Sequence, residues 1–86
     1  MDYKKGYFAT SKAGHDKGKC YIVAYADEMY VYLVNGVTKK LEAPKKKKKM
    51  HIQIQCCIDE ELELKLKDDC KISNEDIKNA LERHLK

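Results

Sequence analysis

The stretch Ser11-Lys12-Ala13-Gly14-His15-Asp16-Lys17-Gly18-Lys19 decides the fold, because it separates two segments that both favour β-structure. The segments on either side are rich in aromatic and β-branched residues, which are typical of strands. Gly14 and Gly18 are expected to adopt positive φ and to let a ligand approach the backbone. Asp16 is expected to hydrogen-bond to the main chain and fix a turn. The stretch therefore predicts a tight, rigid loop whose lysines contact phosphate groups.

Five segments in the first part of the chain have the composition or the alternation of strands. Asn35-Gly36 favours a type I′ hairpin turn, so the strands before and after it are expected to pair. Pro44 is expected to end that pairing because it has no N–H to donate. The lysine run 45–49 follows and is expected to be a solvated segment. The expected strands are 7–11, 19–26, 29–34, 37–41 and 50–55, and five short strands favour a small SH3-like barrel.

The last third of the chain changes to a helical pattern. Ile58, Leu62 and Leu66 recur every four residues, although leucines in this segment also alternate with charged residues as in a strand. Acids at the start of the segment and lysines at its end suit the helix dipole, so we prefer a short helix. Ser73 is expected to be the N-cap of a second helix that ends near Leu85.

Length and charge indicate one small domain with an appendage. The chain has 86 residues and a net charge of +4. Residues 1–58 contain 12 lysines against 5 acids, whereas residues 59–86 contain 6 basic residues against 9 acids. A basic body with an acidic tail favours binding of a polyanion by the body. We expect a mainly β barrel in 1–58 and a helical extension in 59–86 that packs on the barrel or on a partner.

Matches to one family extend over nearly the whole chain. They comprise Gly6, Ser11-Lys12-Ala13-Gly14-x-Asp16-Lys17-Gly18-Lys19, Val23, Asn35-Gly36, Leu41-Glu42-x-Pro44-Lys45-Lys46-Lys47, His51-x-Gln53 and Ser73-Asn74-x-x-Ile77-x-x-Ala80-Leu81. The chain thus resembles the small bacterial KOW-domain RNA-binding proteins, which are relatives of KOW ribosomal proteins of archaeal and eukaryotic large subunits. The resemblance implies a KOW barrel that binds ribosomal or other structured RNA. His15 stands where the family pattern has arginine, so no permanent charge is expected there.

The candidate RNA contacts are basic side chains and loop glycines. Lysines neutralise phosphates without reading sequence, and a lysine block inside a domain is typical of segments that follow a phosphate backbone. The alternative for the block is a linker charged for solubility. One histidine in the set lies in the loop, and the other is expected to pack beside the lysine block. The predicted RNA-binding residues are Lys12, Gly14, His15, Lys17, Gly18, Lys19, Lys39, Lys40, Lys45, Lys46, Lys47, Lys48, Lys49 and His51.

Four tyrosines, Tyr21, Tyr25, Tyr30 and Tyr32, allow two interpretations. They offer platforms on which unpaired bases stack, or they pack the barrel, which is the interpretation we favour. Tyr21 and Tyr25 are expected to share one face of their strand because they are an even number of residues apart.

Other functional classes find little support in the sequence. Cys20, Cys56, Cys57 and Cys70 show no Cys-x-x-Cys spacing, so a zinc site with His51 is disfavoured and we expect reduced thiols. No nucleophile–base pair and no nucleotide-binding glycine loop is apparent, so we expect no enzymatic activity, no metal and no cofactor. The chain shows no signal peptide and no apolar run of about 18 residues, which predicts a cytoplasmic location and no membrane contact.

A second function remains open from the sequence. KOW barrels in transcription elongation factors bind proteins, so the chain is alternatively an interaction adaptor for ribosomal or transcription proteins. The acidic tail would then dock through Ile77, Leu81 and Leu85, which share one helix face. The acid clusters at 59–61 and 68–69 are expected to be solvated helix ends.

Overall fold

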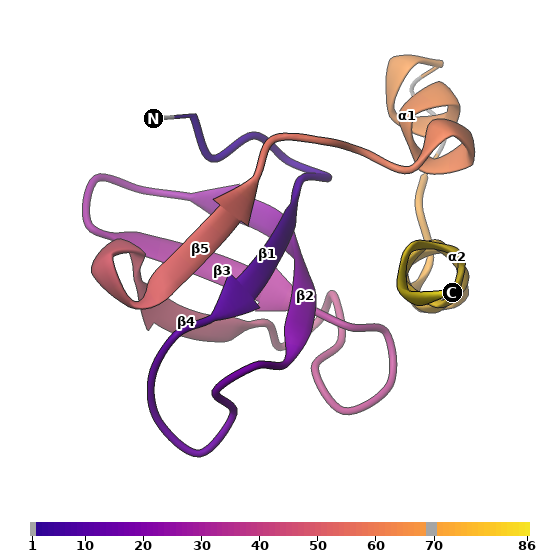
Figure 1. Cartoon of the computed structure of the whole chain (residues 1–86). Coiled ribbons are helices and arrows are strands. Elements are labelled where there is room, and N and C mark those ends of the chain that lie inside the picture. The colour runs from indigo at the N-terminus through magenta and orange to yellow at the C-terminus, as the bar shows by residue number, and fades with distance from the viewer. Residues whose placement is uncertain (1, 69–70) are drawn as a thin grey trace.

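The protein is a five-stranded antiparallel sheet with two helices packed beside it (Figure 1), as seen in a computed structural model that describes residues 2–68 and 71–86. The strand order is β4-β3-β2-β1-β5, so hydrogen bonding does not close the barrel-like sheet. The expected mainly β fold of five strands with a helical C-terminal extension is confirmed. The elements are β1 (Phe8–Ser11), β2 (Cys20–Ala26), β3 (Tyr30–Val34), β4 (Lys45–Lys48), the 3₁₀ helix η1 (Lys49–His51), β5 (Ile52–Gln55), α1 (Glu60–Lys67) and α2 (Asn74–Leu85).

The fourth strand does not follow the Asn35-Gly36 pair, and the expected strand 37–41 is wrong. The lysine run that we expected to be solvated is itself the strand, and it pairs antiparallel with β3. The side-chain oxygen of Asn35 accepts hydrogen bonds from the backbone N–H groups of the second, third and fourth residues after it, at 2.9–3.0 Å. Because these backbone N–H groups bond to the Asn35 side chain, they do not pair with β3, and no two-residue hairpin forms here.

Gly36 is required by a distant contact and not by a hairpin turn. Its φ is +79°, and a Cβ at this position would collide with the backbone carbonyl of Asn74 at the start of α2. The Asn74 side chain accepts a hydrogen bond from the backbone N–H of Leu41 at 2.7 Å and donates one to Glu42 at 2.7 Å. The loop before β4 therefore packs against the first residue of α2 and forms hydrogen bonds with its side chain.

Two apolar cores lie on opposite faces of the sheet. The inner core consists of Ala9, Tyr21, Val23, Val31, Leu33, Ile52 and Ile54. The outer core joins Phe8, Ile22 and Val34 of the sheet to Leu62 of α1 and to Ile77, Ala80 and Leu81 of α2. Each fully buried aliphatic side chain contributes about 1.5–3 kcal/mol, so both helices are held to the sheet by hydrophobic burial.

Local capping explains where the helices begin. The Asp59 side chain accepts from the backbone N–H of Leu62, and Ser73 forms a capping box with Asp76, as expected for an N-cap at Ser73. The helical interpretation of the segment after Ile58 is confirmed over the strand alternative. Asp59 is not a solvated helix end, however, because Arg83 of α2 donates two hydrogen bonds to its carboxylate at 2.7 and 2.9 Å.

A β-bulge in β2 turns its last tyrosine outward. The register with β3 shifts between Val23 and Tyr25, which leaves Ala24 without a partner residue. Tyr21, before the bulge, packs in the inner core at 3% exposure, whereas Tyr25, after it, is 54% exposed on the opposite face. The expectation that these two tyrosines share a face is wrong because the bulge interrupts the strand's alternation.

The role of Gly36 can be tested against a second glycine of the same conformation. Gly36→Ala should lower the free energy of unfolding by about 2–4 kcal/mol, since it adds a backbone collision to the strain of positive φ. Gly18→Ala should cost about 1 kcal/mol, because Gly18 has φ of +89° but no atom within 4 Å of the added methyl group. Urea unfolding followed by circular dichroism measures both. Equal losses would contradict a contact between this loop and α2.

Candidate nucleic-acid interface

The loop between β1 and β2 has a defined conformation that its own backbone maintains. The N–H of Ser11 donates to the carbonyl of Lys19 at 3.0 Å, and the N–H of Gly18 donates to the carbonyl of Ser11 at 2.8 Å. Gly14 and Gly18 have φ of +86° and +89°, as expected. The loop is therefore a closed turn whose main chain is fixed by its own hydrogen bonds.

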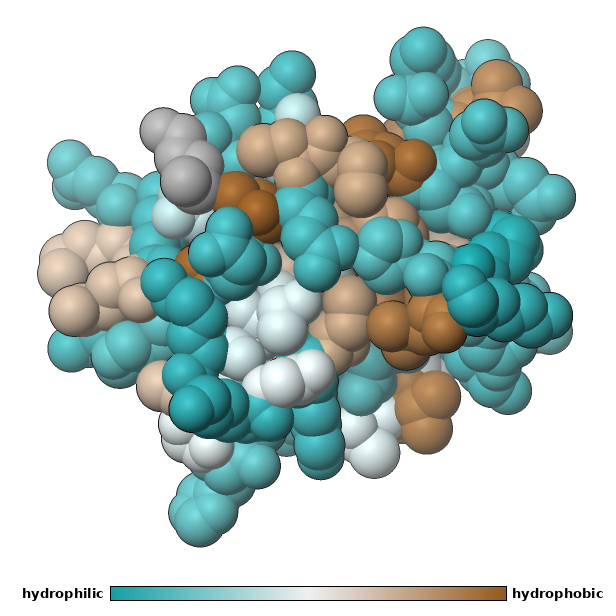
Figure 2. Space-filling view, viewed as in Figure 1, coloured by the Kyte–Doolittle hydropathy of each residue, from teal (hydrophilic) through white to brown (hydrophobic). Residues whose placement is uncertain are grey.

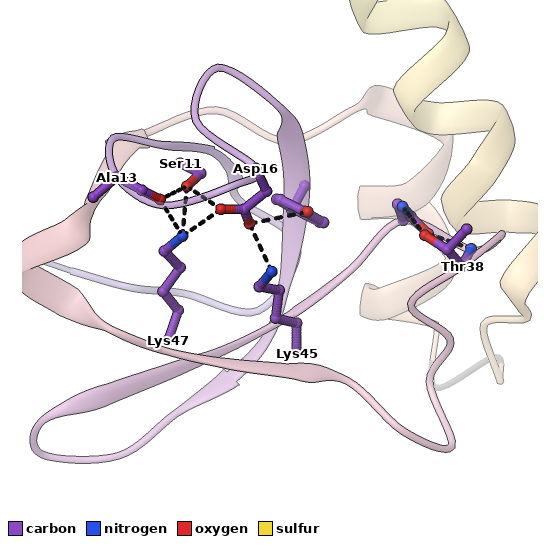
Figure 3. A network of polar contacts seen from close by, with 8 residues as sticks. Ser11, Ala13, Asp16, Thr38, Lys45 and Lys47 are labelled. Carbon is purple, nitrogen blue, oxygen red and sulfur yellow. Dashed lines mark hydrogen bonds and ion pairs between the residues drawn. The ribbon is translucent and has the colours of Figure 1, made fainter.

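Asp16 is the buried centre of this loop, at 5% exposure (Figure 3). Its carboxylate accepts hydrogen bonds from the hydroxyls of Ser11 at 2.9 Å and Tyr21 at 3.1 Å. It also forms ion pairs with Lys47 at 2.5 Å and Lys45 at 3.0 Å. We expected Asp16 to bond to the main chain; instead its side chain connects the loop to β2 and to β4.

Lys47 completes the network from the opposite strand. Its ammonium donates to the Ser11 hydroxyl at 2.7 Å, to the Ala13 carbonyl at 2.6 Å and to Asp16. The side chain is only 11% exposed. Figure 3 shows Lys45 and Lys47 pointing from β4 toward the loop. These two lysines, which we predicted to bind RNA phosphates, are used to hold the loop.

The network shifts the acidity of its members. Burial alone would raise the pKa of Asp16, but hydrogen bonds from Lys47, Lys45, Ser11 and Tyr21 outweigh it and hold that pKa well below its ordinary value of 3.8. Burial and the hydrogen bond to Asp16 raise the pKa of Tyr21 from 10.0 to about 12. At neutral pH the centre is thus a carboxylate that faces two ammonium groups and two neutral hydroxyls.

The structure divides the predicted site residues into two groups. The inward or half-buried members are Lys39, Lys45, Lys47, Lys49 and His51. Lys49 donates to the carbonyl of Glu28 at 3.2 Å, and the carbonyl of His51 accepts from the backbone N–H of Lys12 at 2.8 Å. His51 ends η1 and not a strand. The exposed members are Lys12, Gly14, His15, Lys17, Gly18, Lys19, Lys40, Lys46 and Lys48.

In the helical part, Arg83 forms ion pairs within the protein, and most of the apolar face of α2 is buried. Arg83 pairs with Asp59 at 2.7 Å and with Glu61 at 3.2 Å. Of the face that we proposed for a protein partner, Ile77 and Leu81 are buried in the outer core and Leu85 alone is exposed. On the face drawn in Figure 2, hydrophilic residues predominate and the hydrophobic ones form separate small areas.

The described residues offer little support for a nucleophilic site or a metal site. Ser11 lies beside Lys47 but is 2% exposed, so a substrate has no access to that pair. Cys20, Cys56 and Cys57 are free thiols, and burial raises the pKa of Cys20; Cys70 and Asp69 lie outside the described residues. No group of three or more His, Cys, Asp or Glu side chains in residues 2–68 and 71–86 is arranged to hold a metal ion. No helix in these ranges has the length and apolar character needed to cross a membrane.

Comparison with known proteins leaves the family assignment as a prediction. Neither a scan against protein-family models nor a search of curated proteins finds a match to this chain. The resemblance to KOW proteins therefore rests on the residues quoted above.

Asp16 can be tested through the pH dependence of stability. Because its pKa is lowered by folding, its contribution is complete above the ordinary value of 3.8 and is lost as the pH falls below that value. Asp16→Asn should lower the free energy of unfolding by about 2–3 kcal/mol at pH 7, since the charged partners lose a buried carboxylate. The gap to the unsubstituted protein should close as the pH falls below 3.8.

Urea unfolding at a series of pH values measures this gap, and Asp2→Asn at the exposed N-terminal segment is the matched control. Identical stability of Asp16→Asn and the unsubstituted protein at pH 7 would contradict the network's role.

Proposed function

We propose that this chain is a non-enzymatic, cytoplasmic RNA-binding module for ribosomal or other structured RNA. The observation that carries the proposal is the arrangement of Lys12, Lys17 and Lys19 on the rigid loop. All three are exposed, and none forms an ion pair with an acid of the described residues. Three unpaired ammonium groups on one loop suit a phosphate backbone, and the loop's backbone does not have to be ordered on binding because its own hydrogen bonds already fix it.

The ion pairs that Asp16 forms with two lysines of β4 also support the proposal. A free carboxylate in the middle of this loop would repel phosphates, but Lys45 and Lys47 balance its charge. The lysines around it therefore keep their full attraction for an anion. In this proposal the inward lysines of β4 balance the charge of Asp16, and the loop lysines contact RNA.

Gly18 offers a second feature of the surface. An added Cβ there would meet nothing within 4 Å, so the main chain at this position is open to solvent. A phosphate can approach an open glycine more closely than a residue with a side chain. Gly14 differs, because its Cβ position would lie 3.7 Å from both Asp16 and Lys47.

The remaining candidates divide according to their surroundings. Lys46 and Lys48 point outward from β4, and Lys40 is exposed in the loop before it, so we retain them as phosphate contacts. His15 is exposed in the β1–β2 loop and suits a hydrogen bond to a phosphate or a 2′-hydroxyl. Lys49 offers less to a phosphate than these lysines, because it is half-buried and its ammonium already donates a hydrogen bond to the carbonyl of Glu28 at 3.2 Å.

The loop lysines can be tested with a charge-matched pair of triple variants. Lys12, Lys17 and Lys19→Gln should weaken binding to a labelled fragment of structured ribosomal RNA and reduce the slope of log K against log salt by about 2–3. Lys71, Lys78 and Lys86→Gln removes the same charge from exposed positions near α2 and should leave the slope within about 0.5 of its original value. Fluorescence anisotropy over a salt series measures both.

Two outcomes would overturn the proposal. One is the absence of measurable RNA binding by the unsubstituted protein at low salt. The other is an equal change of slope in the two triple variants, because that would indicate attraction by net charge without a site.

A further inference from the structure

A group of aromatic and basic side chains lies on the outer face of the sheet where the helices do not reach. The helices cover the outer face at Phe8, Ile22 and Val34. Beyond that core, the outer face of β2, β3 and β4 carries three tyrosines and two lysines. We call this the tyrosine face, and it consists of Tyr25, Tyr30, Tyr32, Lys46 and Lys48.

Two of the tyrosines form a fixed stack. The rings of Tyr25 and Tyr32 are 4.1 Å apart between centroids and 11° from parallel. The hydroxyl of Tyr32 donates to the carboxylate of Asp27 at 2.9 Å, and that carboxylate also accepts from backbone N–H groups at the β2–β3 turn. Tyr25 is 54% exposed, so the stack has an outer ring available to a further planar group.

The exposure of Tyr25 follows from the β-bulge. In a regular strand Tyr25 would share the inner face with Tyr21 and Val23, where it would be buried. The extra residue Ala24 places it opposite Tyr32 instead. A bulge that brings a large aromatic ring out of a core removes apolar burial, and such bulges are common beside functional sites.

Positive charge lies next to the rings on the same face. Lys46 and Lys48 alternate with the inward Lys45 and Lys47, and their register partners on β3 are Tyr32 and Tyr30. The ammonium of Lys46 is 4.2 Å from the centroid of the Tyr30 ring. No described acid forms an ion pair with either Lys46 or Lys48.

From this geometry we infer that the tyrosine face binds unpaired bases of RNA, with a base stacked on Tyr25 and the adjoining phosphates at Lys46 and Lys48. The inference rests on the proposed function and makes it more specific: the RNA must contain a single-stranded or bulged segment. Stacked rings beside lysines complement a base and its phosphate, whereas a paired base in an A-form helix has no free face for Tyr25. The loop lysines alone need only phosphates and would accept a duplex.

The experiment compares a blunt RNA duplex with a shorter duplex that carries an unpaired overhang, so that the two RNAs have the same number of phosphates. The overhang contains the fluorescent base 2-aminopurine, whose emission is quenched when it stacks. The unsubstituted protein should bind the overhang RNA more tightly and quench its fluorescence. Tyr25→Leu should lose roughly 5- to 150-fold in affinity for the overhang RNA, the range expected for one base–aromatic stack, and should leave duplex affinity unchanged.

Tyr25→Phe is the matched control, because it keeps the ring and should remain within about threefold of the original affinity. Thermal unfolding verifies that both variants are folded, and quenching by the unsubstituted protein does not depend on any variant. Equal binding of both RNAs without quenching would overturn the inference and leave the proposed function standing. Failure to bind either RNA at low salt would overturn both.

Discussion

The contact between the Asp16 carboxylate and the Lys47 ammonium is the constraint on which the proposed surface depends. The two residues are 31 positions apart in the sequence and join the β1–β2 loop to an edge strand of the sheet. Breaking such a pair leaves a charge without its partner, which costs about 3–5 kcal/mol when both groups are fully buried and less here because Lys45, the other partner of Asp16, is partly exposed. Replacing both partners by apolar residues would often be tolerated. The pair therefore specifies one loop conformation more than it adds net stability.

This constraint gives β4 two different faces. Lys45 and Lys47 point inward and neutralise Asp16, while Lys46 and Lys48 point outward beside the tyrosines. A strand alternates its side chains, so a run of identical residues acquires two roles as soon as it joins a sheet. The Lys47 side chain is only 11% exposed, so its methylene groups are largely removed from water while its ammonium is bound by polar partners. The lysine run is thus both a structural strand and part of a basic surface.

The sequence predicted those features that short-range interactions determine. Ser73 caps its helix through a hydrogen bond three residues away, and Ile52 and Ile54 are buried as their alternation indicates. The failures at Gly36, Tyr25 and Asp16 involve partners that are distant in the sequence or a break in periodicity. Gly36 has no room for a Cβ because the start of α2 lies against it, and no local pattern distinguishes that requirement from a hairpin. The sequence around Tyr25 does not reveal the bulge that exposes it. Which two of the five lysines form ion pairs with Asp16 is decided only when the sheet forms.

In the proposed complex, the loop between β1 and β2 presents its lysines to RNA while the Asp16 network stays intact. Amide chemical shifts during titration with an RNA that contains an unpaired segment test this most directly. We expect the largest changes at residues 12–19, with further changes near Tyr25 and Lys46 and little change along α2. Changes concentrated on α1 and α2, with residues 12–19 unaffected, would contradict it.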